Sequence, residues 1–239
     1  MCGIVGYIGE RSASSVVLGG LKKLEYRGYD SAGIAALYQN GDISVVRAVG
    51  KLHNLEDKLG DGCDLCQVAM GHTRWATHGG VTEQNAHPHL GMEHRVAVVH
   101  NGIIENYGAL RDELEADGVT FASETDTEVI VHLVEKGLCD GADLLTAVRR
   151  ALPRIQGASA FVFISRDDPD CLVTARLGNA GGIVIGQGDG ETFIASDIPA
   201  ILEYTRDVLF LENRQIARIT RDGAEVLSLD DTPVNLRTY

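Results

Sequence analysis

The chain has 239 residues, of which 44% are apolar and 23% charged, and this composition is typical of a soluble globular protein with its own core. A formal net charge of −13 argues against a nucleic-acid-binding surface, and no apolar run is long enough to cross a membrane. Since the N-terminus lacks a secretory signal pattern, we expect a cytoplasmic protein whose five cysteines are reduced.

The first part of the chain begins with a strand pattern followed by a helix pattern. Apolar residues predict a strand over 2–8, and apolar positions at helical spacing predict a helix over 12–24. Two further strands, over 33–38 and 43–49, flank Asn40-Gly41, which is the strongest short signal for a β-hairpin. These two strands are therefore expected to pair antiparallel.

The middle of the chain carries a long polar loop and then helices. Strands are predicted over 68–72 and 95–100, and the His- and Gly-rich stretch between them is too long for a turn, which makes it a candidate functional loop. Helices are expected over 106–116, 125–136 and 141–152. The second of these helices opens on Thr125-Asp126-Thr127-Glu128, which has the pattern of a capping box.

The last third of the chain is a series of short β runs. They are expected over 160–165, 171–175, 182–185, 192–195, 208–211, 215–219 and 225–229. Helices clustered between two groups of antiparallel strands indicate an α+β class, with two sheets between helix layers. We expect a single domain over 1–239, in which residues 231–239 lose periodicity and begin a linker.

Cys2 follows the initiator methionine, and its small side chain favours removal of Met1. The new N-terminal residue would carry a thiol and a free α-amine, whose reference pKa of about 7.7 to 8 leaves an unprotonated fraction able to accept the thiol proton. Nucleophile and general base would then belong to one residue. Taken alone, a Met-Cys start more often means only a small residue on a buried strand, so the rest of the sequence must decide.

The sequence contains, in this order, the segments Cys2–Gly6, Leu24–Gly33, His72–Gly79, His100–Asn106 and Ser123–Glu128. Together they resemble the glutaminase domain of the glucosamine-6-phosphate synthase family. This resemblance implies the four-layer αββα sandwich of the N-terminal-nucleophile hydrolases. The related glutaminase halves of amidophosphoribosyltransferase and asparagine synthetase share the Cys start and an Asn-Gly pair, whereas Tyr29 and the loop from Arg74 to His78 favour the synthase family.

An oxyanion hole is needed for this chemistry, because attack of a thiolate on the glutamine side-chain amide places negative charge on the carbonyl oxygen. By resemblance, the Asn101 side-chain amide and the Gly102 backbone N–H are the donors. Without the resemblance, an Asn-Gly pair would indicate a hairpin turn instead.

Recognition of glutamine requires a cation for its α-carboxylate and an anion for its α-ammonium group. Arg74 suits the carboxylate, since its planar guanidinium can donate two parallel hydrogen bonds. The resemblance assigns Asp126 to the ammonium group, and the alternative is an acidic residue in the first turn of a helix. Thr77 and His78 are expected to make further contacts to bound glutamine.

Two more residues have supporting roles by resemblance. Trp75, the single tryptophan, is expected to belong to a lid that excludes water from the site. Arg27 is placed beside the catalytic residue, where it would orient the α-amine or stabilise the thiolate. The alternative for Arg27 is a solvated arginine on the surface.

The expected reaction is hydrolysis of L-glutamine to L-glutamate and ammonia through a Cys2 thioester, without a metal or cofactor. By resemblance, the ammonia would pass to fructose-6-phosphate on the sugar-isomerase domains of a full-length enzyme, which we expect to be a dimer. Two alternatives stay open: the glutaminase half of another amidotransferase, and a silent binding or redox module built on Cys63 and Cys66. The histidines at 72, 78, 87, 89 and 94 are expected to pack around the loop rather than bind a metal.

Overall fold

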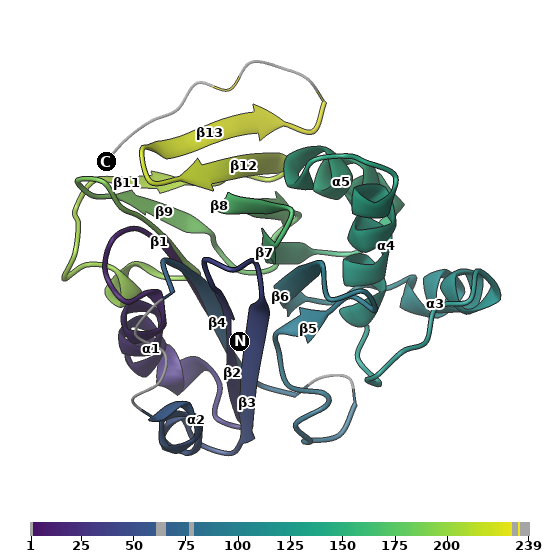
Figure 1. Cartoon of the computed structure of the whole chain (residues 1–239), viewed down its shortest axis with the longest axis horizontal. Coiled ribbons are helices and arrows are strands. Elements are labelled where there is room, and N and C mark those ends of the chain that lie inside the picture. Colours follow the sequence, from purple (N-terminus) through teal and green to yellow (C-terminus); the bar gives the residue numbers. More distant parts are fainter. Residues whose placement is uncertain (1, 61–65, 77–78, 231–233, 235–239) are drawn as a thin grey trace.

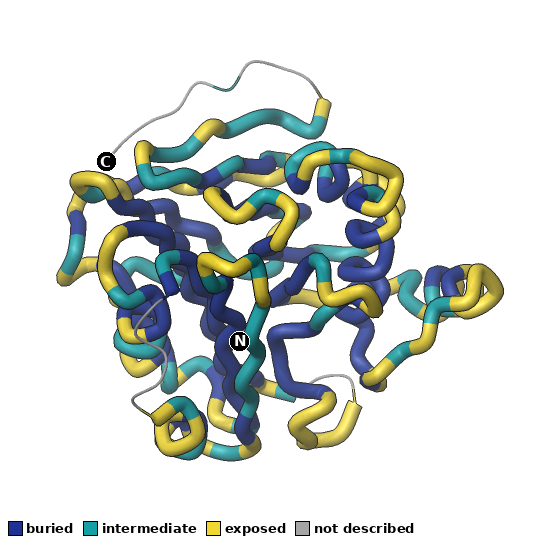
Figure 2. Tube along the Cα trace, in the orientation of Figure 1, coloured by how far each residue is buried: buried dark blue, intermediate teal, exposed yellow. Residues whose placement is uncertain are grey.

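The computed structural model describes residues 2–60, 66–76, 79–230 and 234. Within them the chain forms two β-sheets that face each other, with helices on their outer sides (Figure 1). Buried residues concentrate in the strands, whereas the turns and loops at the periphery are mostly exposed (Figure 2). Among the helices of these residues, none is both long enough and apolar enough to cross a membrane.

The first sheet combines the N-terminal strands with strands from the last third of the chain. Its members are β1 (Gly3–Ile8), β2 (Ser31–Leu37), β3 (Ile43–Val49), β4 (Val68–Arg74), β9 (Val184–Gln187), β10 (Thr192–Ala195) and β11 (Val208–Phe210). They run antiparallel in the order β11-β9-β10-β1-β4-β2-β3. The predicted hairpin joins β2 to β3, and Gly41 adopts a φ of +87° in its turn.

The second sheet is formed by strands from the middle and the end of the chain. They are β5 (His89–Leu90), β6 (Val96–Gly102), β7 (Ser159–Ser165), β8 (Asp168–Leu177), β12 (Gln215–Thr220) and β13 (Gly223–Ser228). Their order is β13-β12-β8-β7-β6-β5, again antiparallel throughout. The two sheets enclose a hydrophobic cluster that includes Ile4, Met70 and Val99.

Helices form the two outer layers. On the first sheet lie α1 (Ala13–Leu24) and α2 (Leu52–Leu59), and over the second lie α4 (Glu128–Cys139) and α5 (Leu144–Ala151). Helix α3 (Tyr107–Ala116) packs on α4, on the side away from the sheet. Separate hydrophobic clusters join each helix layer to its sheet. Short 3-10 helices follow or connect these elements: η1 (Glu25–Arg27), η3 (Leu152–Arg154) and η4 (Ile198–Ala200). The predicted α+β class with a four-layer αββα arrangement is therefore confirmed.

Helix α2 and strand β5 are absent from the sequence-based prediction. In α2 the leucines at 52, 55 and 59 stand at helical spacing, but the element has only eight residues, which is short for a prediction from periodicity. Strand β5 has two residues and begins with a histidine, so it carries no alternating pattern. Both elements pack against neighbouring strands and are too short for the sequence pattern to reveal them.

The start of α4 differs from the predicted capping box. The helix begins at Glu128, and Thr127, which precedes it, makes no side-chain capping hydrogen bond. The Glu128 carboxylate instead accepts hydrogen bonds from the backbone N–H groups of Ala122 and Ser123, each at 2.7 Å. The carboxylate thereby fixes the segment that leads into the helix, and Asp126 lies in this segment.

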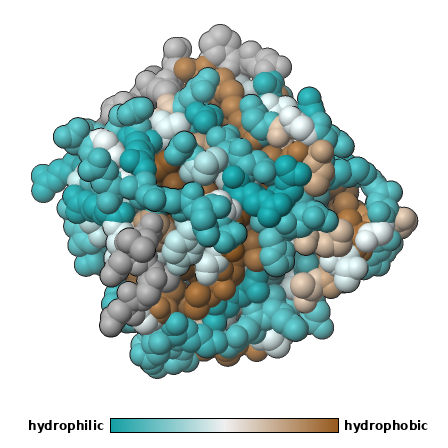
Figure 3. Space-filling model, in the orientation of Figure 1, coloured by the Kyte–Doolittle hydropathy of each residue, from teal (hydrophilic) through white to brown (hydrophobic). Residues whose placement is uncertain are grey.

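Three strand ends meet where the sheets face each other. Cys2 precedes β1, and Arg74 ends the adjacent strand β4, in which Thr73 pairs with Gly3. Gly102 ends β6, which belongs to the opposite sheet and contacts both β1 and β4. Figure 3 shows hydrophilic side chains over most of one face of the molecule, with hydrophobic ones in patches between them. Segments that are far apart in the sequence are thus brought to one place.

Candidate active site

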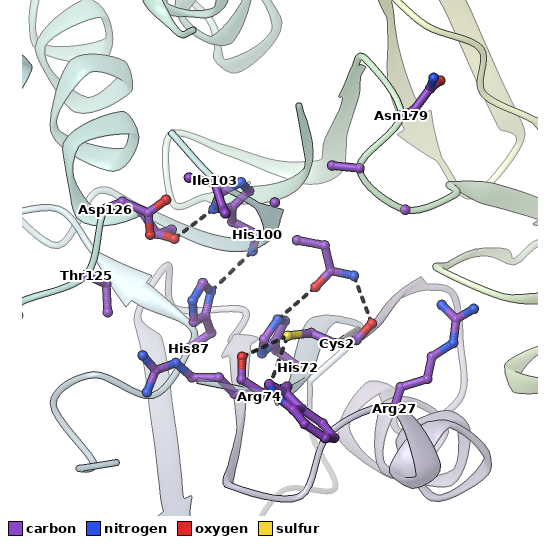
Figure 4. Close-up of a pocket in the computed structure, with 16 residues that line it drawn as sticks. Cys2, Arg27, His72, Arg74, His87, His100, Ile103, Thr125, Asp126 and Asn179 are labelled. Atoms are coloured by element: carbon purple, nitrogen blue, oxygen red, sulfur yellow. Dashed lines mark hydrogen bonds between the residues drawn. The ribbon is translucent and has the colours of Figure 1, made fainter. Parts of the chain in front are cut away.

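A cavity of about 370 Å³ opens at these strand ends (Figure 4). Seven of the residues predicted for the site line it: Cys2, Arg27, Arg74, Trp75, Asn101, Gly102 and Asp126. The two other predicted residues, Thr77 and His78, lie outside the described residues. The cavity therefore gathers a thiol, two guanidinium groups, a carboxylate and an amide from five separate parts of the chain.

The Cys2 thiol lies against the backbone that follows β4. Its Sγ accepts a hydrogen bond from the Trp75 N–H at 3.1 Å. Burial raises the pKa of the thiol above its usual value, although the Trp75 N–H and the charge of Arg74 oppose this rise. At neutral pH the sulfur therefore keeps its proton, so nucleophilic attack requires a base.

Asn101 and Gly102 continue strand β6 to its end. They pair with Ala160 and Ser159 of β7, so the alternative interpretation of this pair as a hairpin turn is wrong. Gly102 adopts a φ of +138°, and a Cβ atom at this position would lie 2.2 Å from the Ala158 carbonyl oxygen. Only glycine fits there, and it leaves the backbone open towards the cavity.

The Asn101 amide bridges the two sheets. Its Nδ2 donates to the Cys2 carbonyl oxygen at 3.0 Å, and its Oδ1 lies 3.0 Å from Nε2 of His72, a residue of β4. The amide is buried, and its N–H donor is bonded to the backbone of the residue that carries the thiol. This is the type of donor that a developing oxyanion requires.

Arg74 and Asp126 place opposite charges in the cavity. Arg74 is buried, and Nη1 donates to the Gly80 carbonyl oxygen at 3.2 Å. Burial lowers the pKa of its guanidinium, while the nearby charges of Cys2, Asp30 and Asp126 raise it. The Asp126 carboxylate accepts a hydrogen bond from the Ile104 N–H at 2.7 Å. Asp126 precedes α4, so the interpretation as an acid of the first helical turn is wrong.

Arg27 is anchored at the far side of the cavity. Its Nη2 donates to the Asp197 carboxylate at 2.8 Å, and its Nη1 donates to the Ser196 carbonyl oxygen at 3.3 Å. Its side chain is 15% exposed, which rules out the alternative of a solvated surface arginine. The Ser196 hydroxyl also accepts the Ile4 N–H at 3.0 Å, so the arginine and strand β1 share one anchor.

Trp75 lies at the mouth of the cavity, with 47% of its surface exposed. Its ring meets the edge of Tyr29 at a centroid distance of 5.5 Å. Asp30 holds the backbone on both sides of Trp75, because its N–H donates to the Arg74 carbonyl oxygen and its carboxylate accepts the Ala76 N–H at 2.9 Å. The segment around Tyr29 therefore positions the segment around Trp75.

Several residues that line the cavity were not assigned a role by the sequence. They are His72, His87, His100, Ile103, Thr125, Thr127 and the loop residues Asn179, Ala180 and Gly181. His72, His100 and Thr125 lie inside the segments that carry the resemblance. That membership suggests that they lie near the site, but it does not say what each residue does there. The loop at 179–181 follows β8 and carries no motif, so only the fold brings it to the cavity.

Four histidines are buried between the two sheets, where their rings contact one another and neighbouring polar groups. The rings of His72 and His87 stack at 4.3 Å, and the His87 Nδ1 accepts the His100 N–H at 3.2 Å. The His100 nitrogens lie 2.8 Å from the Thr127 hydroxyl and 3.1 Å from the Ser159 hydroxyl, and His89 contacts Thr125. Within the described ranges, no group of three His, Cys, Asp or Glu side chains is arranged to hold a metal ion.

Burial keeps these histidines uncharged. It lowers the pKa of His72 to about 3 and that of His100 to about 4, and it lowers the pKa values of His87 and His89 as well. In the unfolded chain each would titrate near its reference value of 6.5. The unfolded state therefore binds more protons as the pH falls below this value, and stability is lost with acid.

We expect the free energy of unfolding to fall by about 2 kcal/mol for each such histidine between pH 7 and pH 5. Urea unfolding at pH 7, 6 and 5 measures it. His100→Gln should reduce this pH dependence by the contribution of one histidine. The control variant is His94→Asn, at an exposed histidine whose φ of +54° suits asparagine. An unchanged pH dependence in His100→Gln would contradict the prediction.

The Cys63-Cys66 pair predicted as an alternative redox module cannot be assembled from the described residues, since Cys63 lies outside them. Cys66 is buried, with its Sγ 3.0 Å from the Ser14 hydroxyl on α1. This position is on the outer face of the first sheet, in the cluster that joins the sheet to α1. It lies apart from the residues that line the cavity.

Comparison with known proteins shows which family the chain matches and which proteins it is similar to. Residues 53–228 match a glutamine amidotransferase domain family. The chain is 51% identical over 98% of its length to a glutamine–fructose-6-phosphate aminotransferase (isomerizing) of Symbiobacterium thermophilum, and 54% identical over 96% of its length to one of Thermosynechococcus vestitus. It spans 38% and 37% of the lengths of these relatives.

Among solved structures, a glutamine phosphoribosylpyrophosphate amidotransferase from B. subtilis has a similar fold. It superposes with a TM-score of 0.81, covers 98% of this chain and 50% of its own, and is 23% identical in sequence. At this identity the likeness concerns the fold. It agrees with the two antiparallel sheets and their helix layers.

Proposed function

This chain belongs to the glutamine amidotransferase domain family, and we propose that it hydrolyses L-glutamine to L-glutamate and ammonia through a thioester on Cys2. The observation that carries the proposal is the presence in one cavity of the Cys2 thiol, the Asn101 amide and the opposite charges of Arg74 and Asp126. Nucleophile, oxyanion donor and both substrate anchors are thereby available to one small amino acid.

The proposed reaction needs a base, because the buried thiol is protonated at neutral pH. After removal of Met1, the α-amine of Cys2 accepts the thiol proton, and the sulfur attacks the amide carbon of glutamine. The proton then passes to the leaving nitrogen, so ammonia departs and the C–S thioester remains. Water attacks this thioester, the C–S bond breaks, and glutamate and the thiol are released.

The charge that develops on the amide oxygen is stabilised by the Asn101 side chain and by the Gly102 N–H. Asn101 is supported for this role by its hydrogen bond to the Cys2 backbone and its place in the cavity, and Gly102 by a backbone that carries no side chain. In the present arrangement one N–H of the Asn101 amide donates to the Cys2 carbonyl oxygen, and its second N–H is available for the substrate oxygen.

The substrate's charged ends bind to the two charged side chains in the cavity. Arg74 holds the α-carboxylate through its guanidinium fork, and Asp126 holds the α-ammonium group. Trp75 belongs to a lid that excludes water from the cavity. Thr77 and His78 make further contacts to the bound glutamine. Arg27 supports the N-terminal residue through the Ser196 anchor that it shares with β1.

In a longer protein, this domain would supply ammonia for glucosamine-6-phosphate synthesis from fructose-6-phosphate. Support comes from the relatives that are named for this aminotransferase and are more than twice as long as the chain. The acceptor sugar would bind to sugar-isomerase domains of that protein. The full-length protein would be a dimer in the cytoplasm. Residues 1–239 would then form one glutaminase domain, with 231–239 as the start of the linker to the isomerase domains.

The purified chain, with its N-terminus determined by intact mass, should release equal amounts of glutamate and ammonia from glutamine. A glutamine-like electrophile should label Cys2 and stop the reaction, while asparagine, which is one methylene shorter, should react much more slowly. Addition of fructose-6-phosphate should leave the rate unchanged if its site lies on other domains. A chain that lacks Met1 but releases no glutamate would refute the proposed function.

A further inference from the structure

The Asn101 side chain is held at both ends of its amide. Nδ2 donates to the Cys2 carbonyl oxygen at 3.0 Å, and Oδ1 lies 3.0 Å from Nε2 of His72. His72 belongs to β4 in the first sheet, whereas Asn101 is near the end of β6 in the second. The contact therefore crosses from one sheet to the other at the wall of the cavity, as Figure 4 shows around His72 and Cys2.

The orientation of this amide follows from the hydrogen-bonding groups around it. A backbone carbonyl oxygen accepts hydrogen bonds and cannot donate them, so the amide nitrogen of Asn101 must face Cys2. Its oxygen must then face His72, and two acceptors would meet there unless His72 carries its proton on Nε2. The network thus selects one amide orientation and one histidine tautomer.

The surroundings of His72 keep the ring in this state. It is 1% exposed and stacks on His87 with an angle of 19° between the ring planes. Burial lowers its pKa to about 3, so the ring is neutral at pH 7 and has a single N–H. Nδ1 is buried without a hydrogen-bond partner in the part of the chain that the structure describes. A residue kept for packing alone would not need a polar ring with one unsatisfied nitrogen.

We propose that His72 is a positioning residue, whose Nε2–H holds the Asn101 amide in the orientation that directs Nδ2 into the cavity beside Cys2. The role rests on the proposed function, since His72 acts on the reaction only through Asn101. A donor that is oriented before the charge develops need not reorganise during the reaction. Loss of His72 should therefore lower kcat and leave KM nearly unchanged.

A matched pair of variants separates the hydrogen bond from the packing. Gln and Met have side chains of similar length, and the Gln amide nitrogen reaches as far from the backbone as Nε2 of histidine. His72→Met should lower kcat by roughly 10- to 100-fold, as loss of an orienting partner does at metal sites. His72→Gln should recover most of this loss. Equal thermal midpoints for the two variants will show that both are folded.

A double-mutant cycle tests whether His72 acts through Asn101. In the Asn101→Ala background, His72→Met should cause no further loss of kcat, because the group that His72 orients is gone. Wild-type kcat in His72→Met would overturn the proposal. A loss that adds in full to that of Asn101→Ala would overturn it as well, because His72 would then act by another route.

A second measurement does not depend on turnover. The side-chain NH₂ signals of Asn101, identified by their absence from the ¹⁵N spectrum of Asn101→Ala, should be resolved and exchange slowly in the wild type. They should move and exchange faster in His72→Met but not in His72→Gln. Signals that are the same in all three proteins would refute the proposal. Absence of wild-type glutaminase activity would instead refute the proposed function, and the NMR comparison would still decide on the hydrogen bond.

Discussion

Replacement of Cys2 with alanine should abolish glutamine hydrolysis and leave glutamine binding almost unchanged. The expected loss in kcat is roughly a factor of a million, as for loss of the nucleophile in a serine hydrolase. Binding should persist because, in the proposed function, Arg74 and Asp126 rather than the sulfur hold the charged ends of the substrate. Alanine is also small enough for Met1 to be removed, so the variant keeps the α-amine and loses only the thiol.

The measurement combines a glutamate-release assay with calorimetric titration of glutamine. Cys139→Ala is the matched control, since this cysteine lies exposed on α4, away from the residues that line the cavity. Its rate should equal that of the wild type. Appreciable turnover in Cys2→Ala would show that another group is the nucleophile, and a loss of binding would show that the sulfur also anchors the substrate.

Replacement of Asn101 with alanine should lower kcat by roughly 100- to 1,000-fold, with a much smaller change in KM. The amide donor meets the substrate oxygen most strongly when that oxygen becomes charged, so the loss falls on the transition state rather than on binding. The Gly102 N–H and the nucleophile remain, which is why the effect should be smaller than that of Cys2→Ala.

Steady-state kinetics of Asn101→Ala measure this loss directly. Asn40→Ala removes an amide from the turn between β2 and β3, outside the cavity, and should keep the wild-type kcat. A change confined to KM in Asn101→Ala would mean that Asn101 binds the ground state of glutamine. In that case the Asn101 contact to His72 would also have to be explained by substrate binding.

Hydrophobic patterning predicted most strands and helices because each of them buries one face, and the spacing of buried positions is a local property of the chain. Short local motifs were less reliable than this patterning, because tertiary pairing can override the turn or cap that a motif indicates. The Asn101-Gly102 pair has the strongest turn signal, yet it completes a strand because β7 offers partners along its whole length. The Thr125–Glu128 segment matches a capping box, yet Glu128 binds the backbone that precedes the helix.

The sequence alone was enough to predict the groups of the site and their proposed roles: a thiol next to a methionine, an amide and a glycine for an oxyanion, and a guanidinium and a carboxylate for a zwitterion. The tertiary structure alone decided how these groups are held. Arg27 is anchored by Ser196 and Asp197, and His72 reaches Asn101 from the opposite sheet. Such contacts join residues that are 29 to 170 positions apart, as the His72–Asn101 and Arg27–Asp197 pairs show. No local periodicity encodes them, because they form only when parts of the chain that are far apart in the sequence pack together.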